Sequence, residues 1–365
     1  MQWGDLITLE YGKPVKDKEC TDGAVPVYGT NGQIGTSHFP PLCKHPSFIL
    51  GRKGAYRGVH YSEVPFSVID TAFFAEPISD KIDLKWAYYK FLTYDINRMD
   101  SGSAIPSTDR YEIYAIEVEL PDLTMQRRVV AVLESIDKKI NVNKAVNDNL
   151  QQQVATIFHQ WFVANPESEK WPLVTLDSLT SLVSRGIAPK YTDDSVQIVL
   201  NQKCIRDHYI DISLARRHNP KVINEKWLQY GDLLINSTGE GTLGRAAQVW
   251  FVPDNMTVDS HVTIVRPKGP HLLFYIGLWG ISHEREIEAL HTGSTGQTEL
   301  PRERVKAMEL RLPDNDTLAR FNVVIAPIVS LIITNQQENV RLSSIRDALL
   351  PKLMSGEIDV SDIQL

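Results

Sequence analysis

The chain has 365 residues, a length that corresponds to about two domains on the usual scale. Its residues are 42% hydrophobic and 23% charged, which excludes a fibrous, a disordered or a small disulfide-rich protein. The formal net charge is -7, so no overall positive charge indicates nucleic-acid binding. Any contact with DNA must therefore come from local basic clusters.

The cysteines and the first ten residues indicate the cellular compartment of the protein. Cys20, Cys43 and Cys204 form no CxxC pair and have no histidine at metal-ligand spacing beside them, so we expect no metal site and free thiols. The N-terminus lacks the basic segment and apolar core of a signal peptide, and no apolar run approaches the ~18 residues of a membrane span. These features predict a cytoplasmic protein that does not associate with a membrane.

The chain opens with a strand-rich region, residues 1–121, and continues into a long helix. From Val129 to Trp161 the apolar residues alternate in steps of four and three, which is a heptad pattern with asparagine at two of its seam positions. This pattern predicts a helix over residues 124–162, about 58 Å long at ~1.5 Å per residue. An ordinary amphipathic core helix is the alternative interpretation of one such segment.

The same organisation returns in the second half of the chain. A strand-rich region over residues 172–313 precedes a second heptad segment, 317–354, which matches the first at an offset of 192 residues and repeats both asparagines. Two copies favour a pair of long helices that pack on each other. The predicted seam consists of Val129, Leu133, Ile136, Ile140, Asn143, Asn147, Leu150, Ile157, Phe321, Ile325, Ile328, Ile332, Asn335, Asn339, Leu342 and Leu349.

The segments between the repeated landmarks differ, and they are polar and rich in turns. Recognition residues tend to lie in such segments, although simple drift of loop sequences is the alternative. Arginine and lysine beside glycine and aromatic residues suit phosphate contact, and asparagine and glutamine can hydrogen-bond to base edges. The alternative is that these charged residues form an ordinary solvent-exposed surface. The candidate DNA-binding residues are Asn31, Gln33, Arg52, Lys53, Tyr56, Arg57, Ser103, Lys203, Arg206, Arg216, Arg217, Asn236, Ser237, Arg245, Ser294 and Gln297.

The sequence contains no recognisable catalytic motif. GxxxxGK[ST], HExxH and GxSxG are absent, and the histidines are scattered singly. Gly239, Gly241 and Gly244 do form a GxGxxG, which would suit a dinucleotide-dependent oxidoreductase. The residues that follow resemble a strand rather than a helix, so we expect a hairpin turn and no catalytic residue.

Several motifs resemble those of specificity (S) subunits of type I DNA restriction-modification systems. They are Pro26–Gly32, Gly51–Gly54, Ser101–Ser107, the Gln-Arg-Arg at 126–128 and, most specifically, Arg346–Ile358. The second copy departs from the pattern at Leu318–Arg320 and at Thr295–Thr298, which weakens the transfer of single residues to it.

The resemblance implies an α+β fold with two target-recognition domains in pseudo-twofold tandem repeat. Each would hold mixed or antiparallel sheets with short helices and be followed by a long helix, and the two helices would form an antiparallel coiled coil. The implied domains are 1–121 and 171–313 for recognition, with 122–170 and 314–365 for the helices and the tail.

The resemblance also implies a non-catalytic adaptor that reads a bipartite, asymmetric target in double-stranded DNA, one half per domain. Its partners would be two modification subunits, which methylate adenine, and restriction subunits. S-adenosylmethionine, ATP and Mg²⁺ would belong to those partners, and this chain would bind no cofactor. A nucleotide-dependent oxidoreductase and a coiled-coil scaffold that binds no DNA remain the alternatives.

Overall fold

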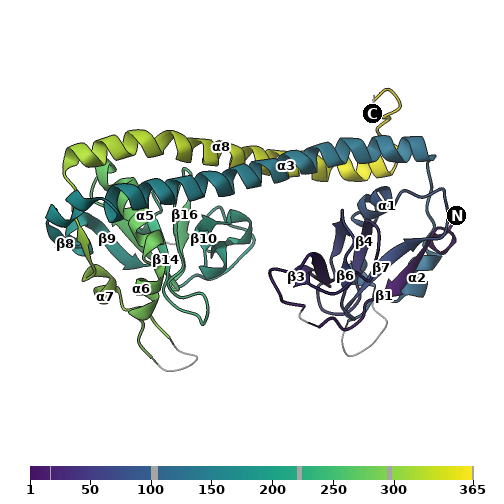
Figure 1. Cartoon of the computed structure of the whole chain (residues 1–365), viewed down its shortest axis with the longest axis horizontal. Helices are drawn as coiled ribbons and strands as arrows, with labels where there is room; N and C mark the ends of the chain where they lie inside the picture. Colours follow the sequence, from purple (N-terminus) through teal and green to yellow (C-terminus); the bar gives the residue numbers. More distant parts are fainter. Residues whose placement is uncertain (17, 100–105, 220–223, 294–297, 364–365) are drawn as a thin grey trace. The chain divides into compact units, whose positions relative to one another are not determined.

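The computed structural model describes residues 1–16, 18–99, 106–219, 224–293 and 298–363 (Figure 1). The chain divides into two compact units, Met1–Val142 with Glu338–Leu365 and Asn143–Gln337. The long helices α3 (Leu123–Phe158) and α8 (Asn315–Met354) contribute to both units. The predicted limits of both helices are thus confirmed to within a few residues, and a π-helical turn, η3 (His159–Val163), continues α3.

Unit 1 is built on an antiparallel sheet of four strands in the order β1-β7-β4-β5, beside a small sheet in the order β3-β2-β6. Helix α1 begins after Asp83, whose carboxylate accepts hydrogen bonds from the backbone N–H groups of Lys85 and Trp86. The elements are η1 (Trp3–Asp5), β1 (Ile7–Tyr11), β2 (Val25–Gly29), β3 (Gly32–Ser37), β4 (Ser47–Gly51), β5 (Val59–Ser62), β6 (Ser67–Val68), β7 (Ala72–Pro77), α1 (Leu84–Phe91), η2 (Ile96–Arg98) and α2 (Arg110–Ala115).

Unit 2 has a four-stranded antiparallel sheet in the order β15-β14-β17-β9 and a small sheet in the order β13-β10-β16. Its strands are β8 (Leu173–Thr175), β9 (Thr180–Arg185), β10 (Ile198–Leu200), β11 (Ile205–Arg206), β12 (Tyr209–Ile210), β13 (Arg216–Arg217), β14 (Leu233–Asn236), β15 (Ala246–Gln248), β16 (Met256–Val258), β17 (Val262–Pro267) and β18 (Glu309–Arg311). Its helices are η4 (Pro166–Lys170), α4 (Leu176–Leu179), η5 (Gln202–Cys204), η6 (Ile212–Leu214), η7 (Asn224–Lys226), η8 (Pro270–Leu272), α5 (Leu273–Ser282), α6 (Glu284–Ala289) and α7 (Arg302–Lys306).

The two units share one topology, which confirms the internal repeat. Strands β1, β7, β4 and β5 occupy the places that β9, β17, β14 and β15 occupy in unit 2. In each small sheet one pair is parallel, β2 with β6 and β10 with β16. The β11–β12 hairpin is an addition of unit 2 among the described residues.

The central strand of each large sheet is buried on both faces, which explains its continuous apolar sequence. Phe48 and Leu50 of β4 pack in the cluster that contains α1, whereas Ile49 between them packs against Phe66 and Val68 near the small sheet. In unit 2, Leu233 and Ile235 alternate with Leu234 of β14 in the same way. Alternation with period two thus joins each large sheet to two separate cores.

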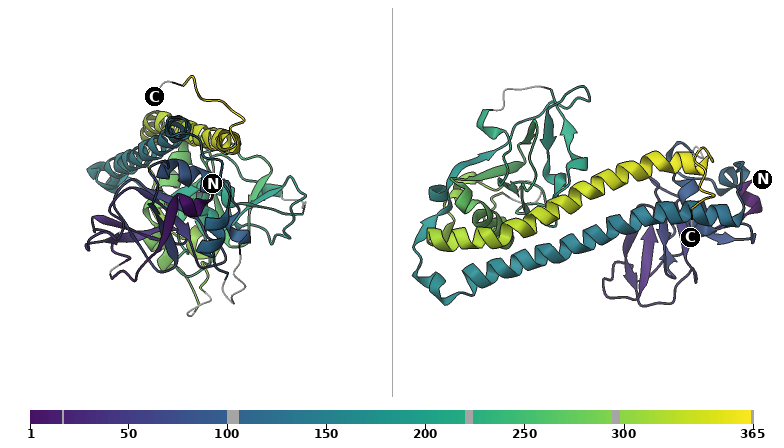
Figure 2. Two further views of the ribbon diagram at one scale, coloured as in Figure 1. Left: turned by 90° about the vertical axis from the view of Figure 1, so that its right-hand side faces the viewer. Right: turned by 90° about the horizontal axis from the view of Figure 1, so that it is seen from above.

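Helices α3 and α8 lie side by side and run in opposite directions (Figure 2). In unit 1, Arg346 forms an ion pair with Asp137 at 3.0 Å, and the Asn339 amide donates to the Ile140 carbonyl at 3.4 Å. In unit 2, the Asn335 amide donates to Oδ1 of Asn147 at 2.8 Å. All sixteen predicted seam residues are buried or half-buried. The predicted antiparallel pairing is confirmed.

Helix α8 has a high mean hydropathy over part of its length. An 18-residue window within it has a mean hydropathy of 1.8, so by length and composition it is the one helix among the described residues that could cross a membrane. Only 33% of that window is buried, although Phe321 and Ile325 lie fully inside the core of unit 2. Polar residues are interspersed along this window, so the chain still has no uninterrupted apolar run of the length expected for a membrane span.

Candidate nucleic-acid interface

The glycine-rich segments of both copies are hairpin turns. Residues 52–58 connect β4 to the antiparallel β5, and residues 237–245 connect β14 to the antiparallel β15. Gly239, Gly241 and Gly244 have φ values of 94°, 71° and 86°, which favour glycine. No helix opens after them, so the structure confirms the predicted turn and gives no dinucleotide-binding geometry.

Beside each turn, two segments of the backbone approach so closely that one of them requires glycine. A Cβ on Gly12 would lie 2.0 Å from the Ile69 carbonyl oxygen, and a Cβ on Gly186 would lie 1.9 Å from the Val258 carbonyl oxygen. Glycine at these two positions lets the residues before them, Tyr11 at the end of β1 and Arg185 at the end of β9, occupy equivalent places in the two units. The internal repeat of the sequence does not reveal that Tyr11 and Arg185 are equivalent, because a tyrosine and an arginine show no similarity.

In unit 1 this place carries a cluster of cations and aromatic rings. The Arg52 guanidinium lies 4.7 Å from the centroid of the Tyr11 ring, and the Arg110 guanidinium lies 4.9 Å from it. Arg110 also lies 5.1 Å from the Tyr111 ring, which is 65% exposed. Arg52 donates from Nη1 to the Asp70 carbonyl at 3.1 Å, and Arg110 donates from Nη2 to the Tyr111 hydroxyl at 3.2 Å. Stacking orients the other guanidinium donors for phosphate oxygens, and exposed rings suit contact with sugars or bases. We call Tyr11, Arg52, Lys53, Arg110 and Tyr111 the basic-aromatic cluster.

The other DNA-binding candidates of unit 1 differ in their exposure to solvent. Asn31 and Gln33 are exposed at the β2–β3 turn, and Tyr56 is 63% exposed. The structure corrects the expectation for Arg57, which is 2% exposed and donates from Nη2 to the Asn97 carbonyl at 2.8 Å. Its guanidinium therefore binds the backbone of η2 from the interior of the unit. Ser103 lies outside the described residues.

Four basic candidates of unit 2 lie on or next to its small sheet and the added hairpin. Arg216 stacks on the Tyr191 ring at 3.6 Å, and Arg217 donates to the Ser195 carbonyl at 2.6 Å. Lys203 and Arg206 are also exposed, on η5 and β11. These four cations are accessible to a polyanion.

The added hairpin is tied to α6 through an ion pair. His208, in the β11–β12 turn, lies 3.4 Å from the Glu284 carboxylate. Hydrogen bonding to that carboxylate raises the pKa of the His208 imidazole above its ordinary value. The protonated imidazole of His208 is therefore favoured by Glu284 and joins the hairpin to α6.

Two further candidates of unit 2 do not reach the surface. Asn236 and Ser237 are fully buried; the Asn236 amide donates to the Gln202 carbonyl at 3.1 Å, and the Ser237 hydroxyl is 2.6 Å from that of Thr263. They fix the start of the glycine turn, which corrects the expectation of base contacts. Arg245 is half-buried, and Ser294 and Gln297 lie outside the described residues.

Unit 2 places other side chains where unit 1 has the basic-aromatic cluster. A surface hollow of about 390 Å³ there is lined by Arg185, Lys226 and Arg302 together with Glu299 and Glu303. Arg185 forms an ion pair with Glu299 at 2.6 Å, so part of the positive charge is neutralised. The offset of 192 residues that relates the helices also relates Arg110 to Arg302, and this was the signal that could have identified both.

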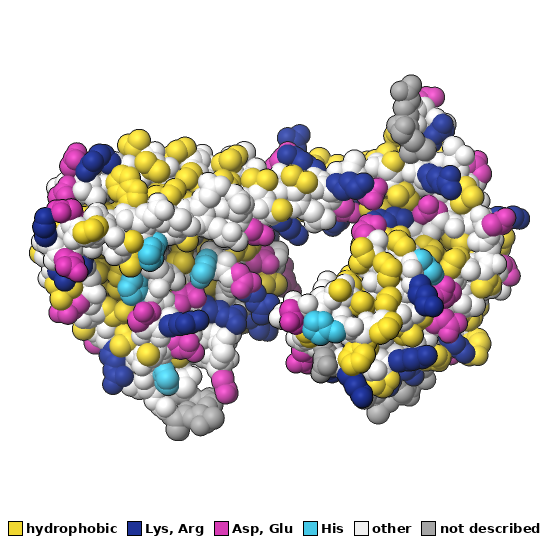
Figure 3. Space-filling view, in the orientation of Figure 1, with side chains coloured by type: hydrophobic (Ala, Val, Ile, Leu, Met, Phe, Trp, Pro, Cys, Tyr) yellow, Lys and Arg dark blue, Asp and Glu magenta, His cyan; other side chains and the backbone are white. Residues whose placement is uncertain are grey.

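The charge on the visible surface is mixed. Figure 3 shows lysine and arginine side chains interspersed with acidic ones on each unit, without one continuous basic field. Hydrophobic side chains are also visible along α8 in the same view. Local clusters rather than overall charge thus distinguish the candidate interface.

Comparison with known proteins gives a consistent class. Residues 1–152 match the family described as type I restriction modification DNA specificity domain. The type I restriction enzyme MjaIX specificity subunit of Methanocaldococcus jannaschii is 24% identical over 320 residues, covering 78% of this chain and 71% of that protein. The HindI specificity subunit of Haemophilus influenzae is 20% identical over 323 residues, covering 67% and 70%.

A solved structure shares the fold. The type I restriction-modification system S subunit from M. genitalium matches with a TM-score of 0.61 at 14% identity, covering 97% of this chain and 95% of that one. The fold of this chain is therefore similar to that of a solved S subunit. The chain is similar to the specificity subunits of type I restriction-modification systems over most of its length, and residues 1–152 match the DNA specificity domain of that family.

Proposed function

We propose that this chain reads a bipartite, asymmetric sequence in double-stranded DNA, one half with each unit, and has no catalytic activity of its own. The observation that carries the proposal is the repeated topology: the same sheets occur twice, while the side chains at equivalent surface places differ. A shared framework with different contact residues is what two independent half-site readers require.

The basic-aromatic cluster of unit 1 and the cations of the small sheet in unit 2 would contact the backbone of each half-site. Phosphate contacts position a protein on the duplex, whereas base edges in the grooves supply the specificity. Asn31 and Gln33 are exposed amides near the first cluster's hairpin and are our candidates for base contacts.

The helix pair would serve as a spacer and as a docking surface for two modification subunits, with restriction subunits joining them. Support comes from exposed apolar residues on the helices, because isolated helices in water would not favour them. Val323 is 75% exposed, Val340 69% and Val142 56%. S-adenosylmethionine, ATP and Mg²⁺ would be bound by those subunits, and the assembly would act in the cytoplasm.

Mapping of methylated adenines tests this function directly. The chain would be expressed with its modification subunit in a host that lacks other adenine methylation. A bipartite motif with an unread gap is expected, and replacement of residues 1–121 by the equivalent region of a related subunit should change one half of the motif only. Unchanged methylation, or a change in both halves, would contradict one reader per unit.

A further inference from the structure

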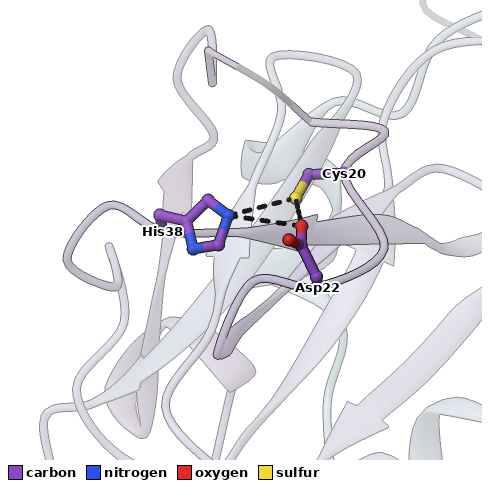
Figure 4. A group of neighbouring side chains, drawn as sticks. All are labelled: Cys20, Asp22 and His38. Atoms are coloured by element: carbon purple, nitrogen blue, oxygen red, sulfur yellow. Dashed lines mark hydrogen bonds and ion pairs between the residues drawn. The ribbon is translucent and has the colours of Figure 1, made fainter.

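Three side chains of unit 1 converge outside the candidate interface. Cys20 and Asp22 lie in the turn before β2, and His38 follows the end of β3 (Figure 4). The Cys20 Sγ atom is 3.4 Å from Nε2 of His38 and 2.6 Å from Oδ1 of Asp22, and that Nε2 is 3.3 Å from that Oδ1. Each residue directs one atom that can bind a metal ion toward the same point.

Backbone contacts hold the two segments together independently of these side chains. The Thr36 N–H and hydroxyl both donate to the Cys20 carbonyl, at 2.7 and 2.9 Å, and the Gly23 N–H donates to the Thr36 hydroxyl at 2.9 Å. A Cβ on Gly35 would lie only 2.5 Å from the Lys18 carbonyl oxygen. The strand and the turn are therefore fixed at close approach before any ion binds.

Thiolate, imidazole and carboxylate together are ligands typical of Zn²⁺. Tetrahedral zinc with its usual bond lengths separates such ligand atoms by about 3.5 Å. Two of the three separations are within a few tenths of that value. The third, between Cys20 and Asp22, must widen by about 1 Å, which the Asp22 side chain permits because it is 83% exposed.

The cluster is also open to solvent. The His38 side chain is 59% exposed, which leaves room for solvent at the point where the ligand atoms meet.

We propose that Cys20 Sγ, Asp22 Oδ1 and His38 Nε2 bind one Zn²⁺ ion, with water as the fourth ligand. The ion displaces the thiol proton to solvent and clamps the turn that holds Cys20 and Asp22 onto the end of β3. The role is structural, since the ion would join two segments that the chain connects only through β2 and β3. This inference is independent of the proposed reading of DNA.

A second group in the same unit provides an internal comparison. Cys43, His45 and Glu76 are the same residue types, with Sγ to Nε2 at 3.9 Å and Sγ to Oε1 at 4.0 Å. His45 already forms an ion pair with Glu76 at 2.7 Å, and burial raises the pKa of the Cys43 thiol to about 11. A buried thiol that resists ionisation is the weaker ligand, so this group is the control.

Cobalt binding tests the site, because tetrahedral Co²⁺ with a thiolate ligand absorbs visible light and replaces zinc in such sites. The untagged full-length chain, kept reduced, would be titrated with Co²⁺ and then with Zn²⁺. We expect one equivalent of Co²⁺ to give the thiolate-cobalt absorption, and Zn²⁺ to abolish it. Cys20→Ser should eliminate the band and His38→Gln should weaken Co²⁺ affinity at least tenfold, while Cys43→Ser retains both.

Far-ultraviolet circular dichroism of each variant controls for folding, and the exposure of Asp22 and His38 predicts unchanged spectra for Cys20→Ser and His38→Gln. A wild-type chain without the band overturns the proposal. So does a band that survives Cys20→Ser and disappears in Cys43→Ser, since the ion would then occupy the buried group.

Discussion

At the scale of single residues, the two units carry different side chains at positions where their backbones are equivalent. Tyr11 and Arg185 both precede a glycine that passes against a carbonyl, yet one receives two guanidinium groups and the other forms an ion pair with Glu299. Cation–π stacking at exposed sites contributes only about 0.5–1 kcal/mol, so its main effect is to orient the guanidinium groups. Orientation matters for DNA because a fixed donor edge meets a phosphate without further ordering.

Arg110 provides the sharpest test of that cluster. Arg110→Ala should weaken binding of the specificity–modification complex to DNA and reduce the salt dependence by about 0.9 in the log–log slope, the amount expected for one phosphate contact. Binding isotherms over a series of salt concentrations measure both quantities. Arg98→Ala removes the same charge from a side chain that is 87% exposed and paired with Asp95, and is the matched control. Equal slopes for the two variants would exclude a phosphate contact by Arg110.

At the scale of secondary structure, the long helices were predictable because the heptad pattern is local. Both helices and the burial of their seam agree with the sequence, since steps of three and four place residues on one face whatever the partner. The pairing of Asn147 with Asn335 could not be derived, because the pattern does not fix which turn of α8 faces which turn of α3.

The sheets and the interface were less predictable, because the contacts that form them are not local in the sequence. Strand order and the parallel pairing of β2 with β6 depend on contacts far apart in sequence. Arg57 lies in the same turn as the exposed Tyr56, and only the fold reveals that it faces inward. Cys20 and His38 are likewise separated by a whole hairpin, so their spacing matched no metal-binding motif.

The asparagine pair yields a prediction for the helix pair. Asn335→Leu alone should lower the free energy of unfolding by about 1–3 kcal/mol, because the buried Asn147 oxygen loses its donor. The double variant Asn147→Leu, Asn335→Leu should recover much of this loss, since two apolar side chains then face each other. Urea unfolding of the four proteins in a double-mutant cycle measures the coupling. Additive losses would mean that the two amides do not interact in solution.

At the scale of the whole molecule, the net charge of -7 argues against strong DNA binding by the chain alone. Affinity for DNA depends largely on the phosphates that a protein neutralises, and the mixed surface offers only local clusters for this. An adaptor that is held by modification subunits can share that task with them. The chain's own contribution is then the choice of sequence and of the distance between two half-sites.

The helices make that distance testable. One heptad inserted after Val142 in α3 and one after Gln337 in α8, where the two compact units divide, preserves the seam while adding about 10 Å of helix at ~1.5 Å per residue. At ~3.4 Å per base pair, we expect the unread gap of the methylated motif to lengthen by about three base pairs, with both half-sites unchanged. Mapping of methylated adenines in cells that express the variant with its modification subunit measures the gap.

A pair of two-residue insertions at the same positions is the control for that experiment. Two residues rotate the following part of each helix by about 200°, so the apolar faces no longer meet and methylation should be lost rather than shifted. If the heptad variant methylates the original motif with its original gap, the helix pair does not set the spacing. In that case the DNA or the modification subunits must determine the distance between the half-sites, and the two units would have to move independently of the length of α3 and α8.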